Sequence, residues 1–277
     1  MFSCAINIPE EEDTNYPAFN GGDTLDIMTW NLELFPKNGN SSIEYLKNAI
    51  TAMQPDIIAL QEISSETSLQ QLTNQLGNYD YYLGEGGGNW GLAFLYQDSL
   101  ITLDTTIYEI YTNMFRPFPR PPLVMEALWQ GEKIVIINNH LKAGSNSDDE
   151  ERREEANQLL HTYIQAHFDN VNIVLLGDLN DILTDVVYEN VFQLFIDDSL
   201  LYKFTDMYIA EGSNLNWSYP SWPSHLDHIL ISNELFDNHI DTRTVLYDTY
   251  LEGRWSEYEE HISDHRPVSI TLIIEGD

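Results

Sequence analysis

The sequence predicts an α/β fold in which two β-sheets pack face to face and the helices lie outside them. Short apolar runs that are typical of buried strands alternate with segments that have helical spacing, and hairpins are mixed with longer helical connections. The 277 residues and the 43% hydrophobic content suit one large domain with a layered core. We therefore expect a single domain over residues 23–277, preceded by a disordered tether over residues 1–22.

The first half of the domain is expected to alternate strands and helices. Ser41 and Glu44 have the spacing of a capping box, which predicts a helix that begins there and runs to about Met53. Gly77 follows a second apolar helical segment and is expected to close it. In chain order, the expected elements are a strand over 25–30, a helix over 41–53, a strand over 57–60, a helix over 66–76, and strands over 79–83, 91–96 and 101–111.

The second half begins with a proline-rich connection over residues 117–122, because proline is excluded from helix interiors and central strands. Gln130-Gly131 is expected to form the turn of a hairpin. A charged segment over residues 145–155 opens a long helix, on which we expect Arg152 and Arg153 to lie on a solvated face paired with acids. The expected strands of this half cover residues 123–129, 133–139, 172–176, 226–231 and 268–274.

The charge balance of the chain is strongly acidic, with 12 Lys and Arg against 45 Asp and Glu and a formal net charge of −33. A field of this sign repels polyanions and argues against tight, non-specific binding of nucleic acid. It does not exclude a nuclease, since an enzyme that meets phosphate through bound cations needs no basic surface.

The N-terminus carries the chain's single cysteine, Cys4, so no intramolecular disulfide is possible. A small residue before this cysteine and an acidic linker after it resemble the end of a bacterial lipoprotein signal; the alternative is an ordinary terminus with an incidental cysteine. The sequence contains no apolar stretch of about 20 residues, so it predicts no integral membrane segment. We expect a monomer that is secreted or lipoprotein-tethered rather than cytoplasmic.

Six apolar strands each run into a polar cluster. Asp, Asn, His and Glu are poor strand residues, so each cluster is expected at the edge or mouth of a sheet. Any one cluster has an alternative structural reading as a turn, a helix cap or a satisfied histidine. The six clusters are Trp30-Asn31, Leu60-Gln61-Glu62, Asn138-Asn139-His140, Gly177-Asp178-Leu179-Asn180, Leu226-Asp227-His228 and Ser263-Asp264-His265. Their carboxylates and amides suit a hard cation with oxygen ligands, Mg²⁺ or Mn²⁺.

Taken together and in this order, the six clusters resemble the motifs of the endonuclease/exonuclease/phosphatase superfamily. The resemblance runs from about residue 23 to residue 274 and includes Asp264-His265-Arg266-Pro267-Val268. It implies a four-layer α/β sandwich of the deoxyribonuclease-I-like type, with the active site at one end. The run from Asn138 to Lys142, followed by an acidic helix, is most similar to bacterial members of the extracellular-nuclease or unassigned branch.

The resemblance also implies a role for each polar residue. Glu62 is the expected main metal ligand, assisted by Asn31 and Asp264. Asp178 would orient or deprotonate the attacking water, and Asn180 would hold the phosphate. His265 would contact a phosphate oxygen or move a proton while Asp227 fixes its tautomer, and His140 matches the second histidine of these enzymes. Arg120, in an Arg-x-Pro segment, and Asn89 are expected to contact substrate, although a surface ion pair and a turn are their alternatives.

The expected function is metal-dependent hydrolysis of phosphate esters by in-line attack of water, with a phosphodiesterase or nuclease as the first hypothesis. A phosphomonoesterase, or an enzyme similar to sphingomyelinases and inositol phosphatases, is the second. A non-catalytic binding module on the same fold is the third. The expected partner is a phosphate-ester substrate, with nucleic acid among the candidates. The aromatic loop with Trp217, Tyr219 and Trp222 would either stack on such a substrate or pack onto the sheet.

Overall fold

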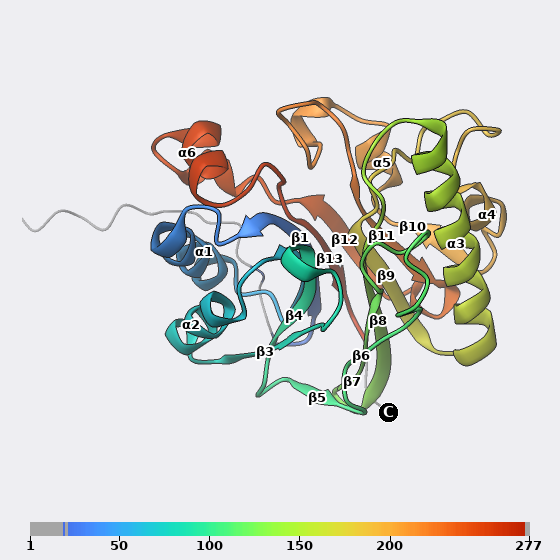
Figure 1. Cartoon of the computed structure of the whole chain (residues 1–277). Coiled ribbons are helices and arrows are strands. Elements are labelled where there is room, and N and C mark those ends of the chain that lie inside the picture. Colours follow the sequence, from blue (N-terminus) through green and yellow to red (C-terminus); the bar gives the residue numbers. More distant parts are fainter. Residues whose placement is uncertain (1–18, 20–21, 275–277) are drawn as a thin grey trace, which may run out of the picture.

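The computed structural model describes Phe19 and residues 22–274, and in it two mixed β-sheets pack face to face with helices on both outer sides (Figure 1). The strands are β1 (Leu25–Phe35), β2 (Ile57–Ile63), β3 (Tyr79–Leu83), β4 (Gly91–Gln97), β5 (Ile101–Leu103), β6 (Tyr108–Glu109), β7 (Leu123–Trp129), β8 (Glu132–His140), β9 (Asn172–Asp178), β10 (Tyr202–Phe204), β11 (Asp227–Ser232), β12 (His239–Thr244) and β13 (Val268–Leu272). The α-helices are α1 (Gly39–Met53), α2 (Glu66–Leu76), α3 (Ser147–His167), α4 (Gln193–Asp197), α5 (Met207–Ala210) and α6 (Arg254–His261). Short 3₁₀ turns are η1 (Gly88–Trp90), η2 (Asn214–Asn216), η3 (Asn233–Leu235) and η4 (Tyr247–Tyr250).

Each sheet is built around one parallel pair of strands. The first sheet has the order β12-β13-β1-β2-β4-β3, and β1 and β2 run parallel at its centre. The second has the order β10-β11-β9-β8-β7-β5, with β6 also on β7, and β8 and β9 are its parallel pair. Parallel neighbours end at the same edge of a sheet, so polar residues that end β1, β2, β8 and β9 are brought to one end of the molecule.

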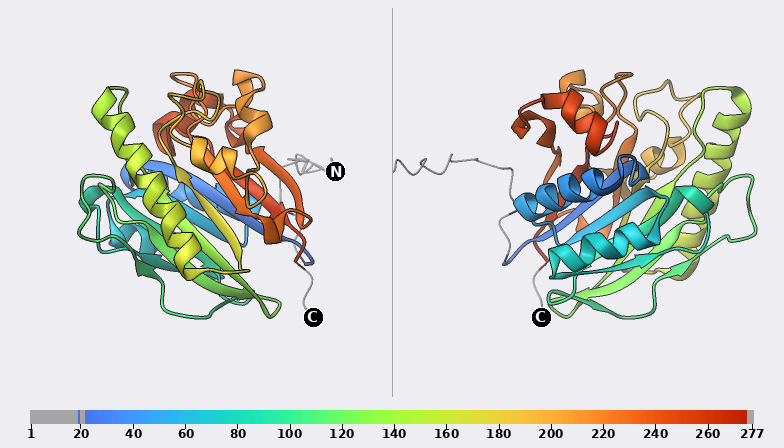
Figure 2. Two further views of the ribbon diagram at one scale, coloured as in Figure 1. Left: turned by 90° about the vertical axis from the view of Figure 1, so that its right-hand side faces the viewer. Right: turned by 60° about the vertical axis from the view of Figure 1, so that its left-hand side comes forward.

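Three apolar clusters hold the four layers together. One lies between the sheets, a second joins the first sheet to α1, α2 and α6, and a third joins the other sheet to α3 and α4. Figure 2 shows α1 and α2, in blue and cyan, on the opposite side of the sheets from α3, in green. The expected fold class, two face-to-face sheets with helices outside, is therefore confirmed.

Most expected elements form where the sequence placed them, and three differ. The helix over 66–76 is confirmed, with a Ser65 cap and with Gly77 in the left-handed conformation. The prediction that a capping box at Ser41 starts the first helix is wrong. Helix α1 already begins at Gly39, and the Ser41 hydroxyl contacts His261 instead. The strand over 101–111 is broken into β5 and β6. The strand over 25–30 continues to Phe35, which carries the polar residues of the first cluster inside β1.

The expected tether over residues 1–22 and the lipoprotein-like Cys4 fall mostly outside the described residues. Phe19, which lies within that range, is buried, and its backbone N–H donates to the carbonyl of Met53 at 2.8 Å. Among the residues that the structure describes, none of the helices is both long and apolar enough to cross a bilayer.

Two buried carboxyl groups lie at the start of the central strands, at the opposite end from the polar clusters. The Asp26 N–H donates to Asp56 Oδ2 at 2.8 Å, and both side chains are buried. Burial raises the pKa of Asp56 to about 7; the hydrogen bond from Asp26 opposes this and the Asp26 charge adds to it. Burial therefore disfavours the ionised form of the Asp56 carboxyl near neutral pH.

Replacing Asp56 with Asn should flatten the pH dependence of stability. Because the folded-state pKa of Asp56 is raised above the model value of 3.8, its contribution is present at acid pH and is lost as the pH rises towards about 7. From pH 5 to pH 8 the wild type should lose roughly 2 kcal/mol more unfolding free energy than Asp56→Asn, measured by urea titration. Asp98→Asn, at an exposed position, is the control and should follow the wild type. Equal pH slopes in wild type and Asp56→Asn would contradict this assignment.

Candidate active site

Asp178 lies at the centre of the polar clusters because of strand register. Asp178 ends β9, and its register partners are His140 on the neighbouring strand β8 and Asp227 on the neighbouring strand β11. Gly177, which precedes it, has φ +144°, and a Cβ there would lie 1.9 Å from the carbonyl oxygen of Asn139. Only glycine allows β8 and β9 to approach this closely. The second sheet thus presents His140, Asp178 and Asp227 side by side.

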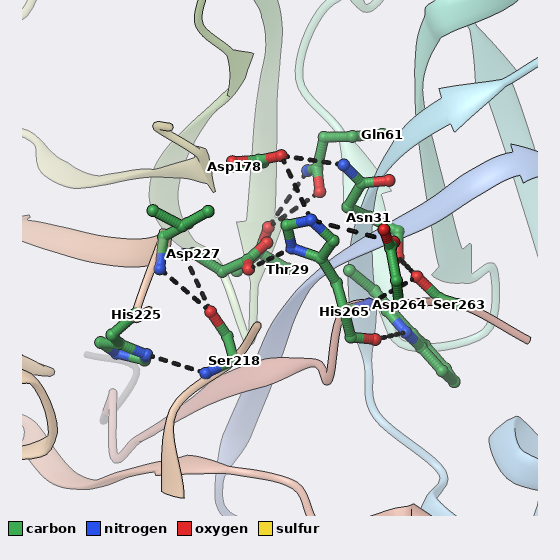
Figure 3. A network of polar contacts seen from close by, with 12 residues as sticks. Thr29, Asn31, Gln61, Asp178, Ser218, His225, Asp227, Ser263, Asp264 and His265 are labelled. Carbon is green, nitrogen blue, oxygen red and sulfur yellow. Dashed lines mark hydrogen bonds and ion pairs between the residues drawn. The ribbon is translucent and has the colours of Figure 1, made fainter. Parts of the chain in front are cut away.

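The first sheet contributes Asn31 and Glu62 opposite these residues. Asn31 Nδ2 donates to Asp178 Oδ2 at 2.8 Å and lies 3.4 Å from Glu62 Oε1. Glu62 Oε2 accepts the backbone N–H of Leu34 at 3.1 Å. The expected metal ligands and the expected acid–base residues, which come from different sheets, therefore meet at the Asn31 amide (Figure 3).

Immediately below this site, a buried amide pair joins the sheets. Gln61 Nε2 donates to Asn138 Oδ1 at 2.8 Å, and Asn138 Nδ2 donates at 3.0 Å to the carbonyls of Leu60 and Ala93 in the first sheet. Both side chains have no appreciable exposure. Gln61 and Asn138 were expected in the polar clusters, and in the structure they serve to join the sheets.

His265 is held between carboxylates from both sheets. Its Nδ1 lies 2.7 Å from Asp227 Oδ2, while Nε2 lies 3.8 Å from Asp178 Oδ2 and 4.0 Å from Asp264 Oδ1. Figure 3 shows the ring between these three side chains. The segment is anchored because Ser263 Oγ donates to the carbonyl of Asn31 at 2.6 Å. The expected pairing of Asp227 with His265 is thus present in the structure.

The charge states of His265 and Asp178 follow from their surroundings. Burial alone would lower the pKa of His265, but the Asp227 and Asp178 carboxylates outweigh it and raise the pKa to about 10. Burial raises the pKa of Asp178, and the charges of Asp227 and Glu62 add to this against the opposing effect of His265. The raised pKa favours the imidazolium form of His265, whose Nε2 faces Asp178 and Asp264.

His140 differs from His265 in charge. Burial holds its pKa well below the usual value, and the positive charges of Arg120 and His265 act in the same direction. Its Nε2 lies 3.5 Å from Asp178 Oδ2 and 3.9 Å from Glu62 Oε1, and its Nδ1 is buried without a hydrogen-bond partner among the described residues. The neutral ring leaves the site with a polar donor that does not add to its charge.

The metal-ligand candidates form a carboxylate cluster. Burial raises the pKa of Asp264; His265 opposes the rise, and the like charges of Glu33 and Glu62 reinforce it. The Asp264 N–H donates to Glu33 Oε2 at 2.9 Å, and Glu33 also pairs with Lys37. Carboxylates that repel one another form a donor set that fits a hard divalent cation. The Asn31 amide oxygen, which here accepts the Glu33 N–H at 2.9 Å, is the further oxygen donor. Asn31, Glu62 and Asp264 would hold such an ion, and Glu33 is a neighbour that the sequence motifs did not single out.

Asn180 and Arg120 meet at one backbone carbonyl. Asn180 Nδ2 and Arg120 Nη1 each lie 3.3 Å from the carbonyl oxygen of Leu141. Burial lowers the pKa of Arg120, whereas the nearby Asp178 and Glu62 raise it. The guanidinium lies 5.9 Å from the ring centroid of Trp90. Arg120, Trp90 and Lys142 line a groove that opens beside Asn180.

Other substrate-contact candidates are only partly gathered at the site. Asn89 is exposed on η1, one residue before Trp90, and the structure shows no contact between it and the clustered residues. Trp217 packs, with its indole N–H donating to the carbonyl of Ile209 at 3.0 Å. Tyr219 lies 4.7 Å from the His265 ring centroid, and Trp222 is 77% exposed.

The expectation that Arg153 lies on a solvated face of α3 is wrong. This side chain is 2% exposed; Nε donates to Asp181 Oδ2 at 2.8 Å, and Nη1 donates to the carbonyls of Lys142 and Gly144. Arg152 donates to the carbonyl of Arg116. The charged sequence around Arg153 resembles any exposed helix, so its burial follows from the loop that packs beneath α3.

Comparisons with known proteins agree with this geometry. A family model described as "Endonuclease/Exonuclease/phosphatase family" matches residues 28–265. TDP2 from D. rerio, solved in complex with a single-strand DNA product, is similar with a TM-score of 0.69 and 15% identity over 91% of this chain and 99% of that one. A mannosyl-6-phosphatase from Bacteroides thetaiotaomicron gives 0.67 and 16% over 90% and 100%. An endonuclease/exonuclease/phosphatase family protein from the same organism gives 0.66 and 16% over 91% and 98%. A search of curated proteins found no match.

Replacing Asn138 with Leu should cost about 1–3 kcal/mol of unfolding free energy, because the Gln61 amide and two carbonyls lose their buried partner. Urea titration measures the change. The matched control is Asn172→Leu, which removes one half-buried hydrogen bond at the other end of the β8–β9 pair and should cost less. A loss at Asn138 no larger than that of the control would show that the amide pair is dispensable.

Proposed function

The chain belongs to the endonuclease/exonuclease/phosphatase family and is a hydrolase of phosphate esters, and we propose that it acts on phosphodiesters with the help of a divalent cation, Mg²⁺ or Mn²⁺. The observation that carries this proposal is the position of the His265 ring between three carboxyl groups. The ring is held by Asp227 at 2.7 Å, and its Nε2 faces Asp178 and Asp264. A fixed positive donor beside a carboxylate cluster suits a phosphate that sits on a cation.

The cation, held by Asn31, Glu62 and Asp264, would neutralise phosphate charge and stabilise the developing negative charge of the reaction. On the protein side, Asp178 is suited to orient and deprotonate water, since its pKa is raised and its Oδ2 is fixed by the Asn31 amide. Asn180 and His265 donate hydrogen bonds to phosphate oxygens. His140 supplies a neutral donor on the far side of Asp178.

The roles of these residues divide between contact and orientation. Asp227 is fully buried and acts through His265, whose tautomer it fixes by accepting from Nδ1. Arg120, next to Asn180, is placed to contact a phosphate oxygen or the leaving group. Asn89 stays a proposed substrate contact on the rim, because its turn lies next to Trp90 and Arg120.

A phosphomonoesterase is the second candidate, and the distribution of cations favours it. A protein that grips a long nucleic acid neutralises several phosphates along a track. Here Lys142 is paired with Asp149 at 2.9 Å and Lys37 with Glu33. Arg120 is the cation of the groove that makes no direct ion pair among the described residues, although Asp178 and Glu62 lie near it. The net charge of −33 adds repulsion for a long polyanion. Short substrates therefore suit this site better than duplex nucleic acid.

With Mg²⁺ or Mn²⁺ we expect turnover of bis(para-nitrophenyl) phosphate to exceed that of para-nitrophenyl phosphate, and EDTA should abolish it until metal is restored. Glu62→Gln should raise the Mg²⁺ concentration needed for half-maximal activity at least about tenfold, because the amide keeps the shape of the ligand but removes its charge. Glu66→Gln, on the exposed start of α2, is the control. Full turnover in chelator would end the metal proposal, and a preference for the monoester would favour the second candidate.

If Asp227 and His265 act as one unit, losing either should cost nearly as much as losing both. Asp227→Asn, His265→Ala and the double variant should each lose about 10²–10⁴ in kcat, and the double should be no worse than the more damaging single change. Steady-state kinetics under saturating Mg²⁺ measures these losses. Multiplicative losses in the double variant would mean that the two residues act independently.

A further inference from the structure

The turn after β9 carries Asn180, one of the proposed functional residues, and has an unfavourable backbone conformation. Asn180 has φ +55°, its N–H donates to Asp178 Oδ1 at 3.1 Å, and its amide reaches Leu141. A non-glycine residue in the left-handed region persists where the surroundings hold it there. The contacts of the next residue, Asp181, show what holds this turn.

Asp181 is held by hydrogen bonds to both its backbone carbonyl and its side-chain carboxylate. Its carbonyl oxygen lies 2.8 Å from His228 Nε2, and its Oδ2 accepts from Arg153 Nε at 2.8 Å. His228 is fully buried on β11, and Arg153 is 2% exposed on α3. The turn is therefore fixed between a strand and a helix that lie on opposite sides of it in sequence.

Both ring nitrogens of His228 face acceptor oxygens. Because a carbonyl can only accept, Nε2 donates to Asp181; Nδ1 lies 2.6 Å from Asp206 Oδ2 and faces a carboxylate. Burial would lower the pKa of His228, but Asp206 outweighs it and the pKa is raised. The pKa of Asp206 is held well below its usual value by His228 and His225, against the effect of burial. The two residues form a buried ion pair.

The neighbouring His225 completes this buried cluster with Asp206 and His228. Its Nδ1 accepts the backbone N–H of Ser218 at 3.2 Å, so in the neutral ring the proton sits on Nε2, which faces Asp206 Oδ2 at 3.1 Å. Despite this distance, His225 Nε2 has no hydrogen-bond partner among the described residues. Ser218 Oγ in turn accepts the backbone N–H of Asp227 at 3.2 Å, which ties the same cluster to the partner of His265 (Figure 3).

We propose that Asp206 and His228 are positioning residues which, together with Arg153, hold Asp181 and so place Asn180 for the reaction. The inference rests on the proposed function. None of the three holding residues touches the substrate position. Their effect comes through the carbonyl and carboxylate of Asp181, and misplacement of a phosphate-binding group by a fraction of an ångström is enough to slow turnover.

Asp206→Asn is the first test, because it keeps volume and the acceptor for the Ile229 N–H but removes the charge that keeps the second proton on His228. We expect kcat on bis(para-nitrophenyl) phosphate to fall about tenfold or more with little change in KM and in the Mg²⁺ requirement. His228→Gln, which keeps a donor for Asp181, should lose less than His228→Leu. Asp56→Asn, a buried carboxyl at the opposite end of the sheets, is the control and should keep wild-type turnover.

The decisive comparison is made in an Asn180→Ala background. If Asp206 acts through Asn180, Asp206→Asn should cost little further activity there, because the group it positions is gone. Multiplicative losses, or an unchanged kcat in the single variant, would overturn the proposal. If Asp206→Asn does not fold, Arg153→Lys tests the other contact that holds Asp181. It keeps the positive charge but removes the Nε donor to the Asp181 carboxylate, and it should lower kcat similarly.

A readout that does not need turnover separates this proposal from the proposed function. In crystal structures of the wild type and Asp206→Asn, we expect the Asn180 amide to move away from the Leu141 carbonyl in the variant. An unmoved Asn180 would overturn the positioning role even in an active enzyme. A wild type that is inert towards phosphate esters would overturn the proposed function, while a displaced Asn180 would still support the structural part of the inference.

Discussion

The hydrogen bond between the Gln61 and Asn138 amides is the contact on which the site depends most. The core between the sheets is apolar, and apolar contact is non-directional, so it sets the separation of the sheets more firmly than their sliding. Gln61 Nε2 meets Asn138 Oδ1 at 2.8 Å, and the Asn138 amide reaches two carbonyls of the first sheet. Buried amides satisfied in this way allow one relative position of the sheets.

That position matters because neither sheet holds a complete site. The first sheet and the segment before β13 supply Glu62, Asp264 and His265, whereas the second supplies Asp178 and Asp227. A slide of one sheet over the other by the rise of a single residue moves a side chain by about 3.3 Å, which would separate His265 from Asp227. Folding of the two sheets into register and assembly of the site are thus the same event.

The parts of this arrangement that were predictable from the sequence are those with a local cause. Apolar runs predicted β2 and β9, a capping serine and a glycine bounded α2, and Gln130-Gly131 marked the β7–β8 turn. The clustering of polar residues next to strands predicted that Asn31, Asp178 and His265 would each lie at an edge or mouth of a sheet, and the resemblance to a known superfamily implied that they share one site. The pairing of Asp227 with His265 came from the resemblance to a known superfamily, since 38 positions separate them along the chain.

What the sequence did not predict has its cause in tertiary contacts. Glu33, Leu34, Glu62 and Asn180 all have positive φ, from 45° to 61°, and nothing local favours that conformation for Glu or Leu. The charged sequence around Arg153 predicts a surface residue, and only the loop that packs beneath α3 buries it. Asp206 belongs to none of the sequence motifs. Such strain and buried charge each oppose folding, and they persist here because three apolar clusters and closely paired strands stabilise the surrounding layers. Glu33, Glu62 and Asn180, which break local rules, lie at or beside the proposed site, where a rigid placement of phosphate, water and cation is required.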